Sequence, residues 1–141
     1  MKNNILIVIV LAYISTVNAG DAKMINDINR IDPNSHSMPE YLTVNNNKLY
    51  FSADNGVYGK ELWVYDGNNA PVMLADIYTG SDGSKPECLT MFNGRLYFSA
   101  EDGTYGKELW VYEHYYAPNI VADIRNGISG SNPGDLTVFN N

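Results

Sequence analysis

The sequence contains one long internal repeat. The stretch "FSADNGVYGKELWVY" at residues 51–65 returns as "FSAEDGTYGKELWVY" at residues 98–112. When residues 40–94 are aligned without a gap on residues 87–141, 31 of the 55 positions are identical. Repeats of roughly 20 to 50 residues are typical of arrays in which copies of one supersecondary unit stack on each other. The chain is therefore expected to build its fold from copies of a single unit.

Each copy contains four short apolar runs separated by residues that favour turns. In the first copy the runs span residues 41–45, 48–53, 61–66 and 71–77. The Asn and Gly residues between the runs tolerate the positive backbone angles of hairpin turns. No run has the apolar periodicity of a helix. The unit is therefore expected to be a four-stranded antiparallel sheet.

The strands carry apolar side chains on both faces. Leu62 and Val64 point to one side of their strand, and Trp63 and Tyr65 point to the other. A sheet with one face in water would alternate apolar and polar residues, so these small sheets are expected to stack. Stacked four-stranded units of roughly 45 residues are typical of propeller blades, and a β-sandwich is the weaker alternative. We predict an all-β fold of β-propeller type, with complete units at residues 40–86 and 87–133.

Shorter pieces of the repeat flank the two complete units. The "NDI" at residues 26–28 matches "ADI" at residues 75–77 and 122–124, so residues 20–39 are interpreted as a partial repeat and loop. Residues 134–141 are interpreted as the first strand of a truncated further unit. Propellers close with about four to eight blades, so two complete units are too few for a ring, and two explanations for this small number stay open. Several chains self-associate into one ring, or a longer propeller supplies the missing blades.

The first 19 residues have the pattern of a secretory signal peptide. Lys2 precedes an uncharged apolar run over residues 5–14, and Val17 and Ala19 occupy the −3 and −1 positions of a cleavage site. As a helix, this run would reach only about 15 Å, half of a bilayer core. We therefore predict a secreted protein (extracellular, periplasmic or at the cell surface) with no membrane span after signal cleavage.

The charge balance bears on the class of partner. Without residues 1–19 the chain has eight basic and sixteen acidic residues, a formal charge of −8. Nucleic acids and anionic membranes require clusters of Lys and Arg, and the sequence contains none. Nucleic acid is therefore not expected as a partner, whereas a glycan or a protein is compatible with this composition.

At "LYFSADNGVYGKELWVYDG" the sequence resembles the ELWxxDGT-repeat family, which forms β-propeller-like repeats in secreted and surface bacterial proteins. Glu61, Leu62 and Trp63, followed by Asp66 and Gly67, match the motif. The second copy keeps the Glu-Leu-Trp of residues 108–110 and then has Glu-His in place of Asp-Gly. The likeness extends over residues 24–141 and implies a repeat scaffold without catalytic residues.

A looser resemblance is to the Asp-box turn of sialidase propellers. Its residues here are Ser52, Asp54, Gly56 and Trp63, and Glu101 takes the aspartate position in the second copy. Asp-boxes stabilise hairpins away from the sialidase active site, so this likeness favours a propeller and not a sialidase activity.

The repeated motif residues are interpreted as structural. The glycines are expected to supply backbone angles that other residues avoid, the tryptophans to fill the space between neighbouring blades, and the glutamates to hold a loop. These residues are Gly56, Gly59, Glu61, Trp63, Gly103, Gly106, Glu108 and Trp110. A paired-carboxylate glycosidase role for the two glutamates is the weaker reading, because a repeat duplicates every residue automatically. We therefore predict no enzyme activity, with a sialidase-like hydrolase fragment as a distant third hypothesis.

No cofactor is predicted from the sequence. The "ADNG" and "GSDGS" loops at residues 53–56 and 80–84 are rich in oxygen ligands, but neither matches the EF-hand calcium loop. A structural Ca²⁺ ion is therefore the weaker reading. His36 and His114 have no second ligand at zinc spacing, so no metal site is assigned.

Four tyrosines are the candidate ligand-binding residues. Tyr58 and Tyr105 lie in equivalent glycine loops, and Tyr115 and Tyr116 replace Asn68-Asn69 of the first copy. Exposed rings in loops stack on sugars or anchor protein partners. The leading hypothesis is a secreted, non-enzymatic β-propeller repeat protein that binds carbohydrate or protein. The alternative is a truncated structural fragment with no independent activity.

Overall fold

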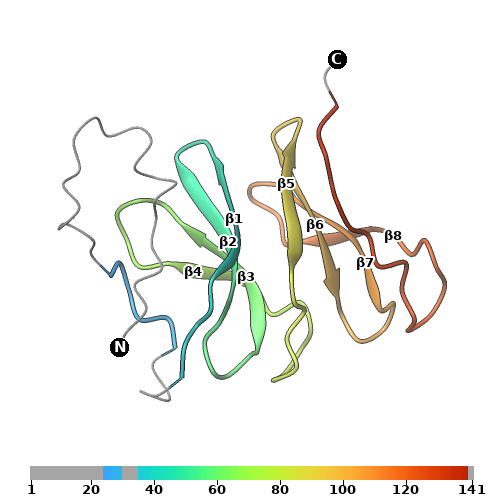
Figure 1. Cartoon of the computed structure of the whole chain (residues 1–141), viewed down its shortest axis with the longest axis horizontal. Coiled ribbons are helices and arrows are strands. Elements are labelled where there is room, and N and C mark those ends of the chain that lie inside the picture. The colour runs from blue at the N-terminus through green and yellow to red at the C-terminus, as the bar shows by residue number, and fades with distance from the viewer. Residues whose placement is uncertain (1–23, 30–34, 140–141) are drawn as a thin grey trace.

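The computed structural model describes residues 24–29 and 35–139, so the predicted signal peptide at 1–19 lies outside the described residues. Within them the chain forms eight strands and two four-stranded sheets (Figure 1). The first sheet has the order β1 (Glu40–Asn45), β2 (Lys48–Asp54), β3 (Lys60–Tyr65), β4 (Val72–Ala75), and the second has the order β5 (Glu87–Phe92), β6 (Arg95–Glu101), β7 (Lys107–Tyr112), β8 (Asn119–Ala122). All neighbouring strands are antiparallel. The predicted all-β fold with two four-stranded units is confirmed.

The two sheets have the same strand register. Phe51 pairs with Trp63 in sheet 1, and Phe98 pairs with Trp110 in sheet 2. Each first strand also contains an irregularity, between Glu40 and Thr43 in one sheet and at the equivalent place in the other. The φ angle is +54° at Tyr41 and +55° at Cys88, so both units build the same bulge.

Each sheet has two apolar faces that we name by their side chains. The tryptophan face of sheet 1 consists of Leu49, Phe51, Ala53 and Trp63, and its valine face consists of Tyr50, Leu62, Val64 and Leu74. The equivalent residues of sheet 2 are Leu96, Phe98, Ala100 and Trp110 on the tryptophan face, and Tyr97, Leu109, Val111 and Val121 on the valine face.

The main core lies between the two sheets. There the valine face of sheet 1 packs on the tryptophan face of sheet 2, with Leu62 and Phe98 completely buried. β1 lies beside β5 in this arrangement, as Figure 1 shows. The inner strands β2 and β3 of sheet 1 are buried along most of their length, as predicted from their lack of a polar face.

The outer faces of the two sheets differ. Ile28 packs on the tryptophan face of sheet 1, whereas on the valine face of sheet 2 the side chain of Val121 is 47% exposed. Residues 134–139, expected as part of the first strand of a further unit, do not form a strand. They nevertheless lie against β5, because the Thr90 hydroxyl donates a hydrogen bond to the carbonyl of Leu136 at 3.2 Å. The two sheets stack without closing into a ring (Figure 1).

Candidate functional site

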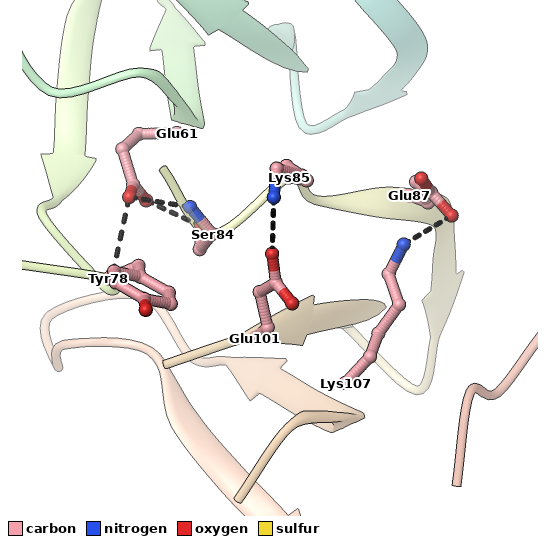
Figure 2. Close-up of polar contacts among 7 residues, drawn as sticks. All are labelled: Glu61, Tyr78, Ser84, Lys85, Glu87, Glu101 and Lys107. Carbon is pink, nitrogen blue, oxygen red and sulfur yellow. Dashed lines mark hydrogen bonds and ion pairs between the residues drawn. The ribbon is translucent and has the colours of Figure 1, made fainter. Parts of the chain in front are cut away.

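Glu61 holds the connection between the two units. This fully buried carboxylate lies at the start of β3 and accepts hydrogen bonds from the backbone N–H groups of Ile77, Tyr78 and Ser84. It also accepts a bond of 2.6 Å from the Ser84 hydroxyl. Figure 2 shows the Glu61 side chain reaching from its strand towards Ser84 and Tyr78. The carboxylate therefore satisfies donors of the loop that leads into β5.

Glu108 makes equivalent contacts in the second unit. Its carboxylate accepts hydrogen bonds from the backbone N–H groups of Arg125 and Ser131, and from the Ser131 hydroxyl. Since both glutamates are buried and bonded to their own loops, these contacts favour a structural role over acid–base chemistry.

The two glutamates differ in their pKa. Burial is the strongest influence on both. It raises the pKa of Glu61 against the opposing effect of the hydrogen bonds from Ser84. At Glu108 the hydrogen bonds from Ser131 and the neighbouring backbone outweigh burial, and the pKa is lowered. The surroundings of the two glutamates differ. Sheet 2 packs on the unit that contains Glu61, whereas among the described residues no further sheet packs on the unit that contains Glu108.

The loop held by each glutamate passes very close to the start of the third strand. A Cβ atom on Gly59 would lie 2.7 Å from the backbone nitrogen of Gly83, and one on Gly106 would lie 2.6 Å from that of Gly130. Any larger residue would collide with backbone there. All four motif glycines have positive φ angles: Gly56, Gly59, Gly103 and Gly106.

The tryptophans occupy equivalent positions with different neighbours. Trp110 lies in the core between the sheets, in the same cluster as Tyr50 and Leu62 of sheet 1. Trp63 packs with Phe51 on the outer side of sheet 1, and its indole N–H donates to the carbonyl of Ala53 at 3.0 Å.

Ion pairs bind the strands and the units together. Lys107 pairs with Glu87 within unit 2, and Lys60 pairs with Glu40 in the same way in unit 1. Lys85 pairs with Glu101 at 2.6 Å and so joins the β4–β5 loop of unit 1 to β6 of unit 2 (Figure 2). The same loop accepts a backbone hydrogen bond at Ser84 from the N–H of Glu101.

The four candidate tyrosines are divided between opposite ends of the sheets. Tyr58 and Tyr105 lie in the β2–β3 and β6–β7 loops, at 38% and 40% exposure. Tyr115 and Tyr116 lie in the β7–β8 loop, at 89% and 68%. The structure therefore does not bring the two pairs together.

A small pocket opens between the sheets at the end that carries Tyr115. Its volume is about 180 Å³, and it is bounded by the β1–β2 turn, the β5–β6 turn and the end of β7. The turns of the two first hairpins lie at the same end of the molecule in Figure 1. The pocket is lined by Asn45, Asn46, Lys48, Tyr50, Met91, Gly94, Leu96, Tyr112 and His114.

Aromatic rings form one wall and the rim of this pocket. The rings of Tyr50 and Tyr112 lie 5.9 Å apart between centroids, and burial raises the pKa of both phenols. The His114 ring lies 4.0 Å from the exposed Tyr115 ring. Tyr50 and Tyr112 belong to opposite faces of different strands, so only the stacking of the sheets brings them together. The repeat pattern contains no signal for this pair beyond the predicted stacking itself.

The oxygen-rich loops use their side chains for backbone contacts. Asp54 accepts a hydrogen bond from the N–H of Gly56, and Asn55 accepts from Val57 and Tyr58. In the second unit Asp102 accepts from Thr104 and Tyr105. Within residues 24–29 and 35–139, no group of three or more acidic, His or Cys side chains is placed to hold a metal ion.

The described part of the chain contains no helix long and apolar enough to cross a membrane. Comparison of the whole chain with protein-family models, with curated proteins and with solved structures finds no match.

Proposed function

We propose that this chain is a secreted, non-enzymatic repeat protein of β-propeller type that functions as a binding module. We further propose that it binds a carbohydrate at the pocket between the two sheets. The observation that carries this proposal is the position of the pocket, which combines the buried Tyr50, the half-buried Tyr112 and two asparagines with the exposed His114–Tyr115 pair at one end of the molecule.

The chemistry of the lining favours a sugar ring. Asn45, Asn46 and Lys48 offer hydrogen-bond donors and acceptors for hydroxyl groups. The rings of Tyr112 and His114 offer flat apolar surfaces on which a sugar face can stack. The pocket is smaller than the roughly 300 to 1,000 Å³ of pockets that enclose a drug-sized ligand. It therefore suits one terminal sugar unit, with Tyr115 contacting the next.

The resemblance to the ELWxxDGT repeats supports an exported scaffold, and the charge of the chain is compatible with a neutral glycan. The buried contacts of Glu61 and Glu108 support a module without catalysis, since both carboxylates already accept bonds from their own loops.

The first test is a glycan array probed with residues 20–141. A retained glycan would then be titrated by calorimetry against His114→Ala and Tyr115→Ala. Loss of one stacking ring is expected to weaken binding about fivefold, on the order of 1 kcal/mol. Tyr58→Ala is the matched control because it removes a loop tyrosine from the opposite end. Equal weakening by Tyr58→Ala, or none by His114→Ala, would contradict the pocket as the site.

A second candidate function is a structural unit without a ligand of its own. The exposed valine face of sheet 2 favours it, because an open apolar sheet face is characteristic of an interaction surface. Failure of every glycan to bind, with the chain folded, would favour this candidate.

A further inference from the structure

We propose that the valine face of sheet 2 is a docking surface for the tryptophan face of a further unit of this same repeat. This inference concerns the side of sheet 2 that faces away from sheet 1, and it does not depend on ligand binding at the pocket.

The chain itself contains one example of the proposed contact. The valine face of sheet 1 packs on the tryptophan face of sheet 2, and Leu62, Phe98 and Ala100 are completely buried between them. The surface that covers a valine face is therefore known in atomic detail: a strand with alternating Leu, Phe and Ala beside a strand with Trp.

The valine face of sheet 2 repeats the chemistry of its counterpart without the cover. Leu109 and Val111 repeat Leu62 and Val64, and Val121 replaces Leu74 by another aliphatic residue. Leu62 is fully buried, whereas Leu109 is only half-buried and Val121 is 47% exposed. Beside them Ile124 is 63% exposed, although its counterpart Ile77 packs into the core between the sheets.

The backbone beyond unit 2 already follows the path of a further unit. The Thr90 hydroxyl bonds to the carbonyl of Leu136 as the Thr43 hydroxyl bonds to that of Leu89. Asn132 and Asp135 have φ angles of +51° and +49°, close to the +50° and +55° of Lys85 and Cys88. In these backbone angles and in this hydrogen bond, residues 132–136 therefore repeat the geometry of residues 85–89, which lead into sheet 2.

The geometry of the first unit also distinguishes between two possible occupants of the valine face, a second copy of the whole chain and a further repeat unit. The tryptophan face of sheet 1 in a second copy of the chain is already covered by Ile28. Asn29 lies against Gly56 there, as Tyr78 lies against Gly103 between the two units. Ile28 and Asn29 thus take the places that Ile124 and Arg125 of another copy would need. The occupant is therefore a repeat unit whose tryptophan face is free.

The experiment adds such a unit. A second copy of residues 87–141 is joined after Pro133, so that the added residues begin where residue 134 stood. Cys88 and its counterpart in the added unit are replaced by Ser, and Val121→Cys then reports access to the valine face through its rate of reaction with a thiol reagent. Leu74→Cys, placed in the equivalent covered position, is the matched reference.

Without the added unit, Val121→Cys is expected to react at least about tenfold faster than Leu74→Cys, because reaction requires exposure of the thiol. With the added unit, the two rates are expected to agree within about twofold. In a third chain, the added counterparts of Phe98 and Trp110 are changed to Asp, and the Val121→Cys rate is expected to stay high.

Three results would overturn the proposal. The first is a Val121→Cys rate that the added unit leaves unchanged. The second is equal protection by the unit with the two aspartates, which would show that any added polypeptide shields the face. The third is a slow rate in the original chain together with a dimeric mass in light scattering, which would make the occupant a second copy. None of these readouts involves a glycan, so they are separate from the test of the pocket.

Discussion

The two repeat units have nearly the same sequence and the same strand register, but they lie in different surroundings. Sheet 1 is covered on both faces, by Ile28 on one side and by sheet 2 on the other. Sheet 2 is covered on its tryptophan face and open on its valine face, where Val121 and Ile124 are exposed. Burial in this molecule is thus determined by the neighbour of a unit and not by the residues of the unit.

The pKa values of the two buried glutamates also depend on the neighbouring unit. Glu61 and Glu108 accept hydrogen bonds from equivalent loop serines. The pKa is nevertheless raised by burial at Glu61 and lowered by the hydrogen bonds at Glu108. A second sheet beside Glu61 removes water that still surrounds the neighbourhood of Glu108, and less solvent makes the charged form costlier.

The largest difference between the units is expected for one repeated leucine. Leu62→Ala removes a fully buried side chain between two sheets and should lower the free energy of unfolding by about 2 to 5 kcal/mol. Leu109→Ala, the same substitution in the open unit, should cost less, because Leu109 is only partly buried whereas Leu62 is fully buried. Urea denaturation of both variants measures the difference.

Equal losses for Leu62→Ala and Leu109→Ala would break the comparison, since they would mean that the valine face of sheet 2 is covered in solution. The mass of the chain by light scattering, measured at the concentration of the denaturation experiment, is the control for such a cover.

The next effect in size concerns the two glutamates. Replacing either carboxylate by an amide turns one of its two acceptor oxygens into an NH2 donor, so at least one donor of the loop loses its acceptor. Each variant should therefore lose about 1 to 3 kcal/mol at pH 7. The dependence of this loss on pH should differ in sign between Glu61→Gln and Glu108→Gln. Stability measured by denaturation from pH 7 down to pH 3 tests this.

The sign follows from the two pKa shifts. A carboxyl with a lowered pKa, such as Glu108, contributes stability above its unfolded value of 4.5 that is lost as the pH falls through the folded pKa. A carboxyl with a raised pKa, such as Glu61, contributes stability that is full below 4.5 and is lost as the pH rises through the folded pKa. On acidification, the cost of Glu108→Gln should therefore shrink and the cost of Glu61→Gln should grow. Parallel pH profiles would contradict this assignment.

The sequence was sufficient to predict the units and their strands, because turn residues and two-sided apolar runs are local signals. The third strand was expected over residues 61–66 and is observed at Lys60–Tyr65. The fourth was expected over residues 71–77 but spans Val72–Ala75. It is shorter because the N–H of Ile77 turns away from strand pairing and donates to Glu61. A contact between residues 16 positions apart is not visible in a local pattern.

The candidate site depended on contacts between units, and these could not be predicted from one unit. The exposed Tyr115 and Tyr116 follow from their loop composition, but the Tyr50–Tyr112 pair requires two particular faces to meet. The opposite pKa shifts of two identical glutamates require a neighbour on one side only. Repetition predicts what the copies share, and these properties arise from what the copies do not share.

The tryptophans should show a smaller difference. Trp63→Phe removes the hydrogen bond from the indole N–H to the carbonyl of Ala53, whereas the indole N–H of Trp110 is buried and has no hydrogen-bond partner among the described residues. Both substitutions remove similar ring volume. Trp63→Phe should therefore cost about 1 kcal/mol more than Trp110→Phe, measured as the difference in unfolding free energy. A larger loss for Trp110→Phe would contradict this, because it would mean that the indole N–H of Trp110 also has a hydrogen-bond acceptor in the core between the sheets.

The smallest effect should come from the ion pair that joins the units. Lys85 and Glu101 lie 2.6 Å apart, but the Lys85 side chain is half-exposed, so a double-mutant cycle with Lys85→Met and Glu101→Gln should give a coupling of about 0.2 to 1 kcal/mol. The coupling should fall further in 1 M salt, where the Debye length is only about 3 Å. The pair has no counterpart after unit 2, because Asn132 stands where Lys85 would repeat. If the coupling instead reached several kcal/mol, a polar contact would hold the units together and the apolar faces would be secondary. A coupling near zero would leave the match of valine face to tryptophan face as the main force that joins one unit to the next.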